Sequence, residues 1–212
     1  MKVIVVGGTG TIGREVVRAL AERHEVISAC RVTAETCVDI GSTASITAMF
    51  LGTGPVDAVV CAAGDARFGP MDTLSEDDYG VALASKLMGQ VNLARAAVDH
   101  LRDAGSITLT AGKLGRVPIP GATSVAMANG AIEAYVRAAA LELPRGIRIN
   151  AVSPNWTVES LRLYGMDESW GVPAAQVALS YVESVEGSRT GTVIDAGWQD
   201  EPALSSASVA AA

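Results

Sequence analysis

The sequence predicts a single α/β domain over residues 1–198, in which helices cover both faces of a doubly wound, seven-stranded parallel sheet. Short runs rich in Val and Ile alternate with longer helical stretches, as in parallel sheets buried on both faces. The first of these runs leads directly into a glycine-rich turn and a helix. Hydrophobic residues make up 49% of the 212 residues, which is enough for one sizeable core. Residues 199–212, rich in Ser and Ala, are expected to form a flexible tail.

The N-terminal stretch predicts a strand, a tight turn and a helix. Residues 2–6 are typical of a fully buried strand, and Gly7, Gly10 and Gly13 follow at a spacing of three. A helix that begins near Ile12 would direct its free N–H groups at the turn, where a pyrophosphate would fit. A second strand at residues 25–29 completes the βαβ context of a dinucleotide site. The alternative is a plain strand-to-helix connection.

The alternation of strands and helices continues to the end of the predicted domain. Ser42 is placed to cap one helix, and Ser75 with Asp78 forms the capping pair of the first long helix. The loop before the second long helix is rich in Gly and Pro, as turns are. Further strands are expected at residues 37–39, 57–61, 106–110, 148–152 and 192–195, and helices at about 42–50, 75–101, 124–143 and 173–184.

Composition excludes several kinds of partner. The net charge of -7 provides no basic surface for nucleic acid, and no apolar run approaches the ~18 residues of a membrane span. The first apolar run is too short for a secretory signal. The three cysteines and two histidines lack metal-ligand spacing. We therefore expect a cytoplasmic protein that acts on a small molecule and has no nucleic-acid, membrane or metal partner.

The order of the elements resembles that of the short-chain dehydrogenase/reductase superfamily over nearly the whole chain, from residue 2 to about 198. Cys61-Ala62-Ala63-Gly64 stands where that family has Asn-Asn-Ala-Gly, and residues 149–154 resemble its Asn-x-Val-x-Pro-Gly. The resemblance implies a Rossmann-type domain that binds a nicotinamide dinucleotide. Asn155 could contact the cofactor amide or simply serve a turn. The expected cofactor-binding residues are Gly7, Thr9, Gly10, Thr11, Ile12, Gly13, Arg31, Thr33, Asp39, Ile40, Ala62, Ala63, Gly64, Pro154 and Asn155.

The family's active-site residues are missing from this chain. The positions of its Tyr-x-x-x-Lys pair hold Val125 and Asn129. The position of its helix Asn holds Lys86, and its Ser falls on Ala111 or Gly112. The chain therefore resembles a divergent branch that has lost the tyrosine acid but keeps the cofactor turn.

The remaining polar groups near the expected pocket give the candidate catalytic residues. These are Lys86, Thr110 and Asn129, of which Lys86 alone is normally ionisable; its alternative is a helix lysine that reaches solvent. The aromatic residues after the sixth strand could cover a ligand pocket or form a small satellite core. The expected substrate-pocket residues are Lys113, Ser124, Val125, Trp156 and Tyr164.

The end of the second strand predicts the cofactor. Ala29-Cys30-Arg31 lacks the carboxylate that selects NAD(H), and the Arg31 guanidinium, with Thr33 following, would suit a 2′-phosphate. We expect an NADP(H)-binding oxidoreductase with a non-standard active site, acting on an unidentified small carbonyl or alcohol compound. The alternatives are a non-redox cyclase, dehydratase or isomerase, and a nucleotide-binding regulatory or scaffold protein. The apolar long helices favour a homodimer or homotetramer.

Overall fold

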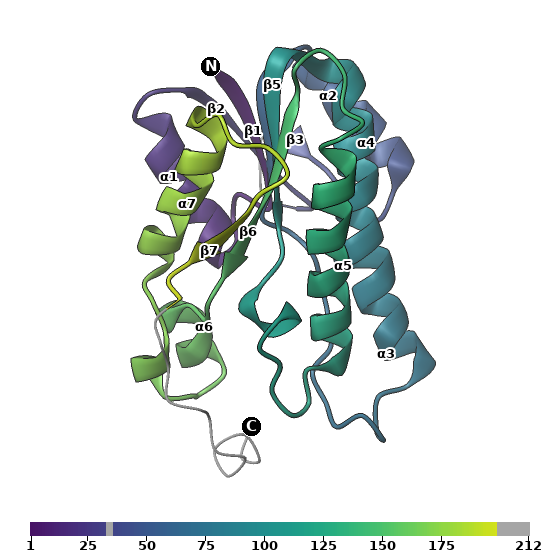
Figure 1. Cartoon of the computed structure of the whole chain (residues 1–212), viewed down its shortest axis with the longest axis vertical. Helices are drawn as coiled ribbons and strands as arrows, with labels where there is room; N and C mark the ends of the chain where they lie inside the picture. Colours follow the sequence, from purple (N-terminus) through teal and green to yellow (C-terminus); the bar gives the residue numbers. More distant parts are fainter. Residues whose placement is uncertain (33–35, 199–212) are drawn as a thin grey trace.

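The computed structural model describes residues 1–32 and 36–198, so Thr33 and the expected tail at 199–212 lie outside the described residues. Seven parallel strands form one sheet in the order β3-β2-β1-β4-β5-β6-β7 (Figure 1). This confirms the predicted doubly wound α/β fold. The strands are β1 Lys2–Val6, β2 Glu25–Cys30, β3 Thr36–Cys37, β4 Val56–Cys61, β5 Leu101–Thr110, β6 Arg148–Pro154 and β7 Val193–Ala196.

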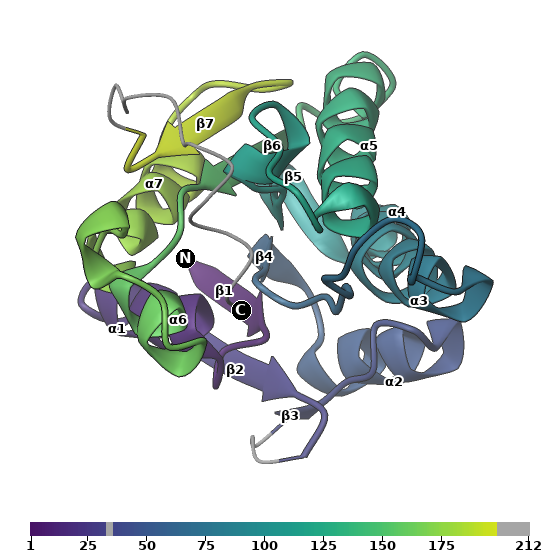
Figure 2. The same ribbon diagram turned by 90° about the horizontal axis from the view of Figure 1, so that it is seen from below.

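Helices cover both faces of the sheet (Figure 2). The helices α1 and α7 lie on one face and α2, α4 and α5 on the other. No helix within the described residues is long and apolar enough to cross a membrane. The helical segments are α1 Thr11–Ala21, α2 Thr43–Thr53, α3 Glu76–Val81, η1 Ala82–Gly89, α4 Gln90–His100, η2 Lys113–Gly115, α5 Thr123–Ala139, α6 Val158–Leu163, η3 Glu168–Trp170 and α7 Ala174–Glu186.

Strand β1 explains why its sequence is apolar throughout. Val3 and Val5 pack into the core beneath α1 and α7, whereas Ile4 and Val6 pack into the core beneath α2, α4 and α5. All four side chains are at most 1% exposed. Because successive residues of a strand face opposite sides, a strand covered twice needs apolar residues at every position.

The first long helix differs from the expectation of one regular helix at residues 75–101. Its start is confirmed, because Ser75 and Asp78 form a reciprocal capping box. Its middle, η1, is a π-helix of eight residues that links α3 to α4. Leu101 already belongs to β5, which begins five residues earlier than expected. Such π-helical turns occur often at functional sites, and η1 contains Lys86.

The segment after β6 contains two short helical elements that were not predicted from the sequence. It contains α6, whose first turn is capped by the Thr157 hydroxyl accepting from the Ser160 N–H at 3.1 Å. A short 3₁₀ turn, η3, follows. At the other end of the fold, α5 ends at Ala139, before the expected residue 143. The sequence showed aromatic clustering after β6 but not the six-residue helix that lies between Trp156 and Tyr164.

Candidate functional site

A cavity opens at the carboxyl ends of β1, β2 and β4. Its volume is about 380 Å³. The strand order reverses here, because β2 and β3 lie on one side of β1 whereas β4 and the later strands lie on its other side. Doubly wound sheets bind ligands at such a switch point. Many of the expected cofactor residues line it, together with Asp65 and Ser85, which the sequence reasoning missed. The expected residues in the lining are Gly7, Thr9, Gly10, Arg31, Asp39, Ile40, Ala62, Ala63 and Gly64.

The glycine turn at this cavity has no room for side chains. Gly7 has φ +82°, and a Cβ there would lie 2.7 Å from the Ala62 carbonyl oxygen. A Cβ on Gly13 would lie 2.0 Å from the Gly7 carbonyl oxygen. Thr11 and Ile12 begin α1, and within residues 1–32 and 36–198 no side chain caps the N-terminal end of that helix. The open N–H groups and close backbone approach fit the pyrophosphate of a dinucleotide.

One side of the cavity carries an exposed ion pair. The Arg31 Nη2 atom lies 3.3 Å from the Asp65 Oδ2 atom, and both side chains are more than half exposed. The Ser85 hydroxyl accepts from the Asp65 N–H at 3.0 Å and so ties this loop to η1. Asp39 instead directs its carboxylate to the N–H of Gly41 at 2.9 Å. Arg31 is therefore the guanidinium available at this rim, with a carboxylate beside it.

Lys86 lies next to the cavity rather than on the outer surface of its helix. Its backbone and stem pack against Gly64, where a Cβ would lie 2.8 Å from the Lys86 Cα. The Lys86 Nζ atom is 3.4 Å from the Ala111 carbonyl oxygen, a long hydrogen bond. Burial lowers the pKa of this amine from its usual 10.5 to about 8, against an opposing contribution from Cys61. An amine of this kind can exchange protons near neutral pH.

Gln90 holds the end of β5 beside Lys86. Its carboxamide donates to the carbonyls of Lys86 at 3.0 Å and Thr110 at 2.9 Å, and it accepts from the Thr110 N–H at 2.8 Å. The side chain is fully buried. Gln90 therefore joins the π-helical segment to the strand that leads to Ala111. The signal available in the sequence was a glutamine one helical turn after the candidate lysine.

Thr110 does not take the position expected of a catalytic residue. Its hydroxyl donates to the Cys61 carbonyl at 2.5 Å and pairs with the Tyr181 hydroxyl at 2.7 Å, within the α7 side of the core. Burial raises the pKa of Tyr181 far above its usual value, so this pair stays neutral. A strand residue faces one side of the sheet only, and Thr110 faces the side away from Lys86. These contacts give the Thr110 hydroxyl a structural function between β4, β5 and α7.

Asn129 is brought close to the loop that follows β5. Its side chain is 3% exposed, and among the described residues no hydrogen-bond partner is found for its Oδ1 atom. A Cβ on Gly112 would lie 2.8 Å from the Asn129 Nδ2 atom. Lys86 and Asn129 therefore approach Ala111 and Gly112, two consecutive residues, from two different helices. A buried acceptor without a partner calls for an explanation.

Pro154 and Asn155 lie apart from the cavity. Pro154 ends β6, and the Asn155 N–H donates to the Ala196 carbonyl at 2.9 Å. The Asn155 carboxamide is directed at the carbonyls of Trp170 and Gly197, each at 3.4 Å. Of the two interpretations given for Asn155, these contacts favour the turn.

The expected substrate-pocket residues divide into two groups. Val125 and Tyr164 both lie near Trp156, which packs against the apolar cluster that contains Val125 and places its ring 6.2 Å from that of Tyr164. Ser124 is fully buried and donates its hydroxyl to the Arg67 carbonyl at 2.5 Å, a contact that fastens α5 to the loop after β4. Lys113 is 9% exposed and places its Nζ atom 5.7 Å from the ring centre of Trp198.

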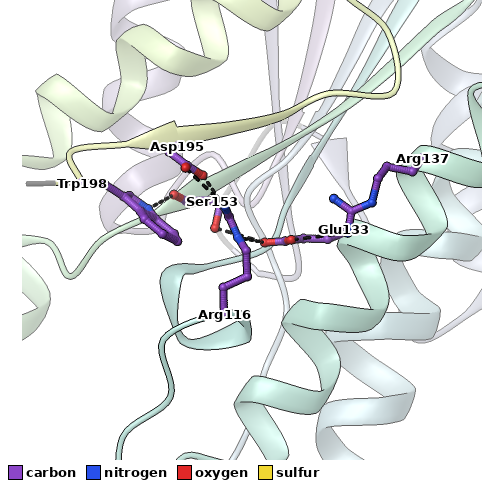
Figure 3. Close-up of polar contacts among 6 residues, drawn as sticks. All are labelled: Arg116, Glu133, Arg137, Ser153, Asp195 and Trp198. Carbon is purple, nitrogen blue, oxygen red and sulfur yellow. Dashed lines mark hydrogen bonds and ion pairs between the residues drawn. The ribbon is translucent and has the colours of Figure 1, made fainter.

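A polar network centred on Arg116 holds the loop after β5 (Figure 3). The guanidinium donates through Nε to the Glu133 carboxylate at 3.0 Å and through both Nη atoms to Asp195. It also lies 4.2 Å from the ring centre of Trp198, whose indole N–H donates to the Ser153 carbonyl at 2.8 Å. The network joins this loop to α5, β6 and β7.

The chain is similar in sequence to a family of reductases and to individual reductases and dehydrogenases. A family model described as enoyl-(acyl carrier protein) reductase matches residues 2–182. Hydroxynaphthalene reductase arp2 of Aspergillus fumigatus is 28% identical over 102 residues, which cover 48% of this chain and 37% of that protein. For 2,3-dihydro-2,3-dihydroxybenzoate dehydrogenase of Escherichia coli the identity is 28% over 141 residues, with coverage of 58% and 57%. The chain thus spans less than two thirds of the length of these curated relatives.

Solved structures match over more of their length. The protein lin1944 of Listeria innocua is 44% identical with a TM-score of 0.88, and the match covers 92% of this chain and 98% of that one. A small-chain dehydrogenase in complex with NADPH is 31% identical with a TM-score of 0.81, and the match covers 92% and 95%.

Proposed function

The chain belongs to the short-chain dehydrogenase/reductase superfamily, and we propose that it is an oxidoreductase that binds NADP(H) and acts on a small carbonyl or alcohol compound through a non-standard active site. The observation that carries the proposal is the position of Lys86. It is a partly buried amine beside the cavity, held against the Ala111 carbonyl, with a pKa of about 8. It stands in the family's active-site register although the family's tyrosine and lysine are absent.

The residues of the cavity fit a nicotinamide dinucleotide. The glycine turn and the first turn of α1 would hold the pyrophosphate, and the small residues Ala62, Ala63 and Gly64 would let the backbone approach the ribose. We assign NADP(H) rather than NAD(H) because Arg31 lies at the rim. A 2′-phosphate carries more charge than the Asp65 carboxylate and would compete with it for the guanidinium.

Lys86 would serve as the proton donor of the reduction. When bound at this cavity, NADPH would supply the hydride for the carbonyl carbon. The Lys86 ammonium would donate one proton to the carbonyl oxygen, leaving a neutral amine that regains its proton from water. In the oxidative direction the neutral amine would accept the alcohol proton. The Ala111 carbonyl orients the amine, and the Asn129 Oδ1 atom, which has no hydrogen-bond partner among the described residues, could accept from the substrate hydroxyl.

The experiment measures NADPH affinity and NADPH oxidation against a panel of aldehydes and ketones, for the native chain and for Lys86→Met. Loss of a positioned proton donor should lower kcat by roughly 10² to 10⁴. Lys2→Met is the control, since the Lys2 Nζ atom donates to the Thr53 carbonyl at 2.7 Å and lies on a different element. If Lys86→Met preserves both turnover and cofactor affinity, the proposed site is wrong. If NADPH binds but no carbonyl compound is reduced, the non-redox alternatives are favoured.

We also propose that the protein is a cytoplasmic homodimer or homotetramer. Leu83, Met88 and Met127 are 38%, 42% and 42% exposed on η1 and α5. Apolar side chains on two neighbouring helices would be removed from water by a second copy. Light scattering that finds only monomer at micromolar concentration would contradict this assembly.

A further inference from the structure

Three aromatic side chains from separate segments meet at the carboxyl ends of the strands. Phe68 lies in the loop after β4, Trp156 two residues after β6, and Tyr164 directly after α6. Their ring centres are 5.8 Å (Phe68 to Trp156), 6.4 Å (Phe68 to Tyr164) and 6.2 Å (Trp156 to Tyr164) apart, in tilted or edge arrangements. Such geometry is favourable for aromatic pairs. The chain has only nine aromatic residues (Trp 3, Tyr 4, Phe 2), so their convergence here is selective.

This aromatic wall keeps much of its ring surface open to solvent. Phe68 is 44% exposed and Tyr164 is 59% exposed. Beneath it lies a small apolar floor of Leu114, Ala122 and Val125, against which Trp156 packs. Val125 occupies the position aligned with the family's tyrosine. Through Trp156 and Val125 the wall therefore borders the place where the reacting end of a substrate would lie.

Two hydroxyl groups next to the wall already have hydrogen-bond partners. Ser124, next to Val125, donates its hydroxyl to the Arg67 carbonyl. Thr157, next to Trp156, donates its hydroxyl to the Ser160 Oγ atom at 2.7 Å. The floor itself is aliphatic. Recognition at this place would therefore depend on stacking and apolar contact more than on hydrogen bonds to side chains.

We propose that Phe68, Trp156 and Tyr164 bind the ring system of a planar aromatic substrate. This inference rests on the proposed function, because Lys86 would exchange the proton on the oxygen of an aldehyde, ketone or secondary or primary alcohol whose carbon is attached to that ring. An offset stack or an edge contact with the exposed Phe68 and Tyr164 rings would add affinity that a saturated ring of the same skeleton cannot obtain.

The test compares two probes, 2-naphthol and decahydro-2-naphthol, titrated by calorimetry into the full chain with and without NADPH. We expect 2-naphthol to bind about tenfold more tightly. Phe68→Leu and Tyr164→Leu should each reduce this preference roughly two- to tenfold, as expected for the loss of one aromatic contact. Leu163→Ala is the matched control, because Leu163 is an apolar neighbour on α6 with 78% exposure and is absent from the aromatic cluster.

The outcomes separate this inference from the proposed function. Equal affinity for the two probes, or a preference that survives both replacements, overturns the aromatic wall. If NADPH binds while the preference is absent, this inference alone fails. If NADPH does not bind but the preference is present and is lost in the variants, the wall stands and the oxidoreductase proposal fails. Both replaced side chains are well exposed, and thermal unfolding checks that each variant remains folded.

Discussion

Replacing Lys86 by Met should make the protein more stable at neutral pH, and the gain should shrink as the pH rises. The pKa of Lys86 is lowered from 10.5 to about 8 in the folded chain because burial disfavours the charged amine. This difference corresponds to about 3 kcal/mol of folding free energy while the amine is protonated in both states. Because the side chain is only partly buried, we treat this value as an upper limit.

The direction of the pH dependence follows from proton binding. Between pH 8 and 10.5 the unfolded chain holds a proton on Lys86 more often than the folded chain, so native stability rises with pH there. The Lys86→Met variant lacks this contribution. Its advantage should therefore be greatest below pH 8 and should fall through the window from pH 8 to 10.5.

Urea unfolding followed by tryptophan fluorescence, at several pH values from 7 to 10, measures this difference directly. Other groups titrate in both proteins, so the difference between the two curves isolates Lys86. Lys2→Met reports the effect of removing one positive charge elsewhere. A stability difference that stays constant across the pH range would mean that the ammonium is well hydrated. The proton-donor role would then lose its physical basis.

Two further substitutions test the cofactor end of the cavity. Arg31→Ala should weaken NADPH binding by roughly tenfold or more, because charge-assisted bonds to a phosphate are lost, and should change NADH binding little. Fluorescence titration measures the affinity for each cofactor. Equal losses of affinity for NADPH and NADH would argue against 2′-phosphate recognition. Gly13→Ala should lower the free energy of unfolding by about 1 to 3 kcal/mol and weaken cofactor binding, because its Cβ would lie 2.0 Å from the Gly7 carbonyl oxygen. Gly52→Ala is the control, because no atom of the described part of the chain, apart from its chain neighbours and its own helix backbone, lies within 4 Å of a Cβ there. A Gly13→Ala variant as stable as this control would contradict the packing argument.

The fold was predictable because local sequence and burial agree. β1, buried on both sides, can hardly be read as anything but a core strand, and the capping box at Ser75 specifies a helix start. Interior irregularities were not predictable in this way. The π-helical turns of η1 have the same apolar spacing as an ordinary helix over so short a stretch. Their origin is tertiary, since Gln90 binds both the Lys86 carbonyl and the end of β5.

Sequence position located the candidate site more reliably than residue chemistry did. Lys86 and Asn129 were identified by alignment with family positions, and both approach the loop at Ala111 and Gly112. Thr110 and Ser124 were chosen as nearby hydroxyls, yet both donate to main-chain carbonyls inside the fold. The direction in which a hydroxyl points depends on register. A shift of one residue reverses the face of a strand residue and rotates a helix residue by roughly 100°. Phe68 was missed because nothing in its own stretch shows that it meets residues 88 and 96 positions later in the chain.

The Arg116 network holds the glycine-rich loop after β5 against α5 and β7. The Glu133 side chain is 2% exposed, and a buried carboxylate without a charge partner costs several kcal/mol. Its partners are Arg116 at 3.0 Å and Arg137 at 3.7 Å (Figure 3). Releasing the loop would therefore remove the nearer partner. Glu133 also lies one helical turn beyond Asn129, so the contact that fixes the loop fixes the same buried face of α5 that presents Asn129 to Gly112.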